Sequence, residues 1–159
     1  MRSLSKDRLD ALLGGIVCAD ECALVHEAAL MAWGIDNNLV PYAVDVLVPK
    51  KEYARIVSIE GGVESECQGN RFVQIKTSYA SVRIWKSVGE GMTYGASRLV
   101  NCVATGYKCL HPELVLEALP SSPDFSYLLE QRAALAEVLY FDDMTDEELM
   151  EFRSFVRGV

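Results

Sequence analysis

Apolar residues recur at helical spacing at the beginning of the chain, and short apolar runs follow soon afterwards. In residues 4–17, leucine and isoleucine lie three and four positions apart, which predicts an amphipathic helix that two glycines weaken at its end. Residues 23–25 are apolar but too few to form more than a strand. A second helix is predicted over 26–33, because Gly34 suits the position that follows a last helical turn. Trp33 lies on the apolar stripe of this helix, so we expect its side chain to be buried.

Alternation of side-chain character predicts strands in the middle of the chain. In residues 42–48 the valines share one face, and Asp45 lies on the other face between Ala43 and Leu47. The other elements expected in this region are, in chain order, a short helix over 50–59, a mobile loop over 60–70, strands over 71–77 and 81–88 with a hairpin turn at 78–80, and short strands over 99–104 and 107–110.

The last third of the chain is predicted to be helical. Pro112 suits a first helical position and Pro120 ends that helix. A longer helix is expected from Ser122, and a capping box at Thr145 and Glu148 begins a terminal helix. The predicted fold is α+β: one domain, 1–159, with an N-terminal helix in 1–20, a β-rich middle in 21–110 and a helical C-terminus in 111–159. A small mixed or antiparallel sheet is expected to be covered by the helices.

Charge and composition narrow the classes of function. The formal net charge is −8, which disfavours a nucleic-acid-binding face because phosphate binding uses clustered Lys and Arg. No apolar run approaches the about 18 residues of a membrane span, and no signal peptide is evident. The five cysteines form no CxxC motif, so we expect reduced thiols in a cytoplasm. Acidic residues crowd 142–151; they form either a solvated helix start or a partner-binding face made of Asp143, Asp146 and Glu147.

Candidate catalytic chemistry is sparse in this sequence. His26 is expected to cap or pack a helix start and His111 to be an N-cap or loop residue, and no nucleophile motif occurs. Asp45 is the strongest candidate for chemistry among the polar residues, because a carboxylate on a strand is a common metal ligand in phosphoryl-transfer enzymes. One carboxylate is too few for such a site. The alternatives are that its face of the strand meets solvent, or that it pairs with Lys76 or Arg83. We therefore predict no catalytic residue, cofactor site or metal site.

Three stretches carry a family resemblance. Residues 26–35 read HEAALMAWGI, residues 39–46 read LVPYAVDV, and residues 111–117 read HPELVLE. Their order resembles the C-terminal domain of AbiEi-type antitoxins of bacterial abortive-infection systems, across roughly residues 20–120. The family has serines where this chain has His26 and Ala29 or its neighbour, and an aspartate where it has Glu117. Residues 1–20 leave no room for the family's winged helix-turn-helix, so the resemblance implies only the toxin-neutralising part.

The same region also resembles the minimal nucleotidyltransferase fold. In that fold a Gly-Gly or Gly-Ser pair precedes a helix and Asp-x-Asp follows in a strand. Here His26 and Glu27 stand at the glycine pair, Ala43 at the first aspartate, and Arg83 about where a third acid is expected.

These observations predict a non-enzymatic, cytoplasmic domain that binds a protein partner, such as a nucleotidyltransferase-like toxin. The alternatives are a catalytically degenerate nucleotidyltransferase-fold domain, in which alone Asp45 would be a metal-binding residue, and a small acidic inhibitor of a nucleic-acid enzyme.

Overall fold

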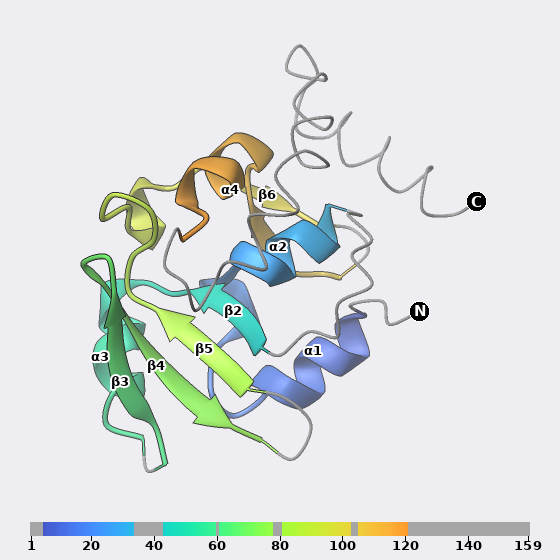
Figure 1. Cartoon of the computed structure of the whole chain (residues 1–159). Helices are drawn as coiled ribbons and strands as arrows, with labels where there is room; N and C mark the ends of the chain where they lie inside the picture. Colours follow the sequence, from blue (N-terminus) through green and yellow to red (C-terminus); the bar gives the residue numbers. More distant parts are fainter. Residues whose placement is uncertain (1–4, 34–42, 60, 78–80, 103–104, 121–159) are drawn as a thin grey trace.

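The computed structural model describes residues 5–33, 43–59, 61–77, 81–102 and 105–120 (Figure 1). Seven strands in these residues form one mixed sheet in the order β3-β4-β5-β2-β1-β7-β6. The strands are β1 (Ala23–Leu24), β2 (Ala43–Leu47), β3 (Val63–Cys67), β4 (Asn70–Lys76), β5 (Ser81–Trp85), β6 (Leu99–Asn101) and β7 (Lys108–Leu110). The helices are α1 (Lys6–Leu13), α2 (His26–Ala32), α3 (Lys50–Ile56) and α4 (Pro112–Ala118), with 3₁₀ turns η1 (Ala19–Glu21) and η2 (Tyr94–Ala96). The predicted α+β class with a mixed sheet is confirmed.

The centre of the sheet combines parallel and antiparallel pairs. β2 runs parallel to β5 and antiparallel to β1, and β1 runs parallel to β7. The outer pairs β3–β4, β4–β5 and β6–β7 are antiparallel. Both faces of β2 are covered, because Val44 and Val46 on one face and Leu47 on the other are all buried. β2 is therefore an interior strand, and a polar side chain on it must find its partners within the protein.

Helix ends follow the local sequence. The hydroxyl of Ser5 accepts a hydrogen bond from the backbone N–H of Arg8, which caps α1. The predicted N-cap role of His111 is confirmed: its Nδ1 accepts from the backbone N–H of Glu113 at 3.4 Å, and Pro112 takes the first turn of α4.

Helices pack on the sheet through buried aromatic residues. Figure 1 shows α2 lying across β2, with α4 next to it. Trp33, at the end of α2, is fully buried as predicted, and its indole N–H donates to the carbonyl of Leu110 in β7 at 2.9 Å. On α3, the Tyr53 hydroxyl donates to Glu64 of β3 at 2.7 Å. Among the described residues, no helix has the length and apolar character needed to cross a bilayer.

The prediction of a mobile loop over 60–70 is wrong. Residues Val63–Cys67 form edge strand β3, which pairs with β4 from Val63 opposite Gln74 to Cys67 opposite Asn70. The turn consists of Gln68 and Gly69, whose φ angles of 50° and 84° suit a tight hairpin. The charges and glycines that suggested a loop are tolerated because β3 lies at the sheet edge, where charged residues are common.

The predicted turns at 36–38 and 78–80 and the predicted helices after Pro120 lie outside the described residues.

Candidate functional site

Asp45 lies in the middle of β2, opposite Arg83 of β5 in the parallel register. Its side chain is fully buried, and only 11% of the Arg83 side chain is exposed. Arg83 Nε donates to Oδ1 of Asp45 at 2.7 Å and Nη2 donates to Oδ2 at 2.9 Å. The indole N–H of Trp85, two residues further along β5, donates to the same Oδ1 at 2.8 Å. These three residues are called the Asp45 cluster.

The Asp45 cluster decides between the interpretations of Asp45 that the sequence leaves open. Pairing with Arg83 is confirmed, and exposure to solvent is wrong because the side chain is fully buried. A two-pronged guanidinium–carboxylate pair is among the strongest charge-assisted contacts in proteins. Both carboxylate oxygens are engaged, and the neighbouring charge is positive. This arrangement pairs the buried carboxylate with a cation inside the sheet.

His26 is the second polar residue of this region, and it packs against the Asp45 cluster. Its ring meets Trp85 edge-on with centroids 4.8 Å apart, and Phe72 stacks on Trp85 at 4.4 Å. Burial lowers the pKa of His26 to about 4, so the ring is neutral at pH 7. The N-cap of α2 is Val25, so of the two roles predicted for His26 the packing role is confirmed and the capping role is not.

The backbone of His26 is unusual for its residue type. Its φ of 51° lies in the left-handed region, which glycine adopts without strain and other residues rarely adopt. The first residue of α2 therefore keeps a backbone conformation suited to glycine while it carries an imidazole. His26 is also the position where the nucleotidyltransferase resemblance expects a glycine.

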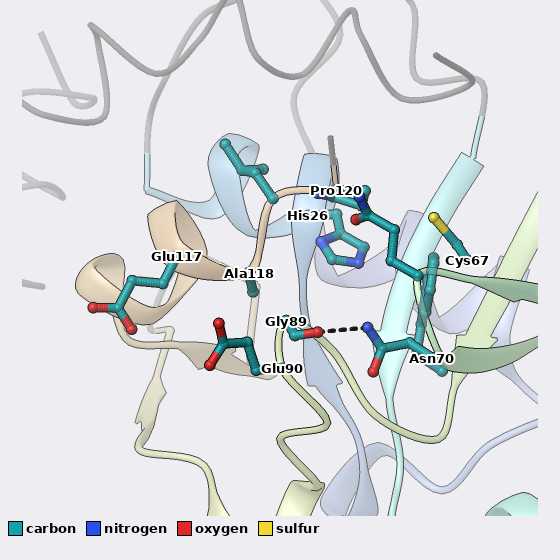
Figure 2. Close-up of a pocket in the computed structure, with 11 residues that line it drawn as sticks. His26, Cys67, Asn70, Gly89, Glu90, Glu117, Ala118 and Pro120 are labelled. Atoms are coloured by element: carbon teal, nitrogen blue, oxygen red, sulfur yellow. Dashed lines mark hydrogen bonds between the residues drawn. The ribbon is translucent and has the colours of Figure 1, made fainter. Parts of the chain in front are cut away.

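A cavity of about 390 Å³ opens beside His26. It is lined by His26, Cys67, Gln68, Asn70, Trp85, Gly89, Glu90, Glu117, Ala118, Leu119 and Pro120, and is called the His26 cavity. Figure 2 shows Glu90 and Glu117 on one side of it, Asn70 and Cys67 on the opposite side, and His26 between them. The sequence does not reveal this cavity, because its walls come from four separate parts of the chain. The one local signal is the histidine at the start of α2.

The remaining predicted residues are placed as follows. Asp143, Asp146 and Glu147 lie outside the described residues. All five cysteines lie within them and none forms a disulfide there; Cys18 is exposed and the other four are buried. In the described part of the chain, no three His, Cys, Asp or Glu side chains come together as a metal site would require.

Comparison with known proteins gives one structural neighbour. No protein-family model matches the chain, and no curated protein matches it either. A solved structure from Thermotoga maritima, described as a "putative nucleotidyltransferase", is similar over 90% of this chain and 98% of its own, with 14% sequence identity and a TM-score of 0.46. A likeness of this degree assigns neither a family nor a function to this chain.

Proposed function

We propose that this chain is a non-enzymatic domain that works by binding a protein, in the manner of the toxin-neutralising part of an AbiEi-type antitoxin. The observation that carries the proposal is the Asp45 cluster. Asp45 occupies the strand position where a metal-binding acid is expected, yet its oxygens are held by Arg83 and Trp85. Metal-assisted nucleotide transfer needs several free oxygens that converge on the metal.

The free-energy cost of freeing the Asp45 carboxylate to bind a metal ion supports the same proposal. To bind a metal, the carboxylate would first have to leave a nearly buried guanidinium. Separating a buried ion pair leaves an uncompensated charge, at a cost of about 3–5 kcal/mol. A second candidate, a nucleotidyltransferase-fold domain that has lost catalysis, draws on the same observation. Both candidates imply that the chain does not transfer nucleotides.

The acidic face of Asp143, Asp146 and Glu147 is the surface that we propose for the partner. The partner is a toxin of the nucleotidyltransferase type with a basic surface, and the complex forms in the cytoplasm. The net charge of −8 supports this choice, because opposite charges on two partners accelerate association.

The test is co-expression with the toxin-like product of a neighbouring gene, followed by binding measurements on the purified pair. The wild-type chain is expected to relieve growth arrest and to bind with a salt-sensitive association rate. Replacing the three acidic-face residues by lysine should slow association at least tenfold. The matched control reverses three exposed acids elsewhere, Asp20, Glu21 and Glu66, which changes the net charge equally.

Equal weakening by both triple variants would show that net charge, and not the acidic face, drives association. Growth arrest that the wild-type chain does not relieve, with both proteins present, would contradict the antitoxin function.

A further inference from the structure

We propose that the His26 cavity is a binding site for a small organic amine, a primary ammonium group on a short apolar body. The proposal rests on the cavity alone and is independent of the protein-binding function. Its volume of about 390 Å³ lies within the roughly 300–1,000 Å³ that is typical of small-molecule pockets.

One residue in the wall of the His26 cavity has a strained backbone. His26 has a left-handed φ of 51° and lines the cavity, whereas the similar φ of 50° at Gln68, also in the lining, belongs to the β3–β4 hairpin turn. Gly89 lines the cavity without strain at φ 61°, and a Cβ atom there would lie 3.4 Å from Cα of Ala118. Such strain persists where the surrounding structure enforces it, and it concentrates at binding sites.

The charge of the lining selects a cation. Its acidic side chains are Glu90 and Glu117, both exposed, and it contains neither lysine nor arginine. His26 adds no positive charge at pH 7, because burial lowers its pKa to about 4. A phosphate group would therefore meet only repulsion from the charged groups of the lining, whereas an ammonium group would pair with the two carboxylates.

The opposite wall can bind the other end of such a ligand. The Nδ2 group of Asn70 donates to the carbonyl of Gly89 at 2.7 Å, and Oδ1 accepts from Ser87 at 2.8 Å. These bonds fix the orientation of the amide, which still has one N–H and one lone pair to offer. Leu119 and Pro120 add apolar atoms to the lining. An amine with an apolar body and a hydrogen-bonding tail matches this lining.

A metal ion matches the cavity less well than an amine. Calcium takes six to eight oxygen ligands, and magnesium binds through one or two carboxylates together with waters and substrate phosphates, which the two glutamates of this cavity would repel. The lining offers two carboxylates, and in the described residues no three His, Cys, Asp or Glu side chains lie close enough together to hold a metal ion.

The experiment is calorimetric titration of the full chain with tyramine, which joins a primary amine to a flat apolar ring with a hydroxyl tail. The matched ligand is 4-ethylphenol, which is tyramine without its amino group. Tyramine is expected to bind saturably at one site, and 4-ethylphenol at least tenfold more weakly. ATP, as an anionic ligand, should not bind at this site.

Two double variants locate the site. Glu90→Gln with Glu117→Gln should weaken tyramine binding at least tenfold. Glu21→Gln with Glu66→Gln removes the same number of exposed charges outside the cavity and should change the dissociation constant less than twofold. All four residues are exposed, so folding should be unaffected, and circular dichroism checks this. Absence of saturable tyramine binding, equal effects of the two double variants, or equal affinity for 4-ethylphenol would each overturn the proposal.

Discussion

Removal of the guanidinium at Arg83 tests whether the Asp45 cluster is a buried ion pair on which the sheet depends. Arg83→Met keeps most of the length of the side chain and deletes its charge. It leaves a fully buried carboxylate with the Trp85 indole as its remaining side-chain donor in the described residues. An uncompensated buried charge costs about 3–5 kcal/mol of unfolding free energy. With an m-value of about 2 kcal/mol per M, the urea midpoint should fall by about 1.5–2.5 M.

The partner substitution completes a double-mutant cycle. Adding Asp45→Asn to Arg83→Met removes the stranded charge and leaves an amide oxygen that can accept from Trp85. The double variant should therefore recover most of the loss and lie within about 1–2 kcal/mol of the wild type. Unfolding in urea, followed by tryptophan fluorescence and far-ultraviolet circular dichroism, measures all three variants.

A matched control separates this effect from the general loss of an arginine. Arg71 in β4 pairs with Glu64 in β3 at 2.8 Å, with side chains 57% and 33% exposed. Arg71→Met should cost less than about 1 kcal/mol, because exposed ion pairs contribute little. If Arg83→Met costs no more than Arg71→Met, the carboxylate of Asp45 does not depend on the Arg83 guanidinium and could leave it to bind a metal ion.

Three further outcomes follow from the described contacts. Trp33→Ala should cost about 3–5 kcal/mol, because it empties a fully buried site and strands the Leu110 carbonyl; an unchanged melting temperature would contradict the packing of α2. Burial holds the pKa of His26 at about 4 against an ordinary 6.5, so the folded protein should lose stability as the pH falls from about 6.5 towards 4. Asparagine tolerates a left-handed backbone, so His26→Asn should make the unfolding free energy, measured in urea, depend less on pH between about 4 and 6.5. An unchanged pH dependence would show that His26 is not the group that titrates. Gly69→Ala should cost about 1 kcal/mol, because the φ of Gly69 is 84° although there is room for a methyl group. Gly95 also has room for a methyl group but its φ lies outside the left-handed region, so Gly95→Ala should cost less. Equal melting temperatures of the two variants would contradict the hairpin turn.

Local sequence patterns predict much of this fold. The helix at 26–33, the strand at 42–48 and the helix start at Pro112 appear close to their predicted places, because glycine, proline and side-chain alternation act within a few residues. The edge strand β3 is missed because charged residues and glycines are equally typical of loops and of edge strands. Its pairing with β4 decides the structure, and that pairing involves another part of the chain.

The candidate site is less predictable from the sequence than the fold. Asp45 stands out because a carboxylate interrupts an apolar strand, and pairing with Arg83 is one of the alternatives that the sequence leaves open. Which alternative holds depends on the register of β2 and β5, which places Asp45 opposite Arg83 although they are 38 positions apart in the sequence. The His26 cavity forms where four segments that are distant in the sequence come together, and no residue spacing in the sequence predicts that they do.

Whether the chain transfers nucleotides is measured by incubating it, purified, with labelled nucleoside triphosphates, magnesium and candidate protein and nucleic-acid acceptors. We expect no labelled product above the level of a heat-denatured sample, because the oxygens of Asp45 are held by Arg83 and Trp85. Turnover by the wild-type chain that disappears in a folded Asp45→Asn variant would show instead that the carboxylate serves catalysis.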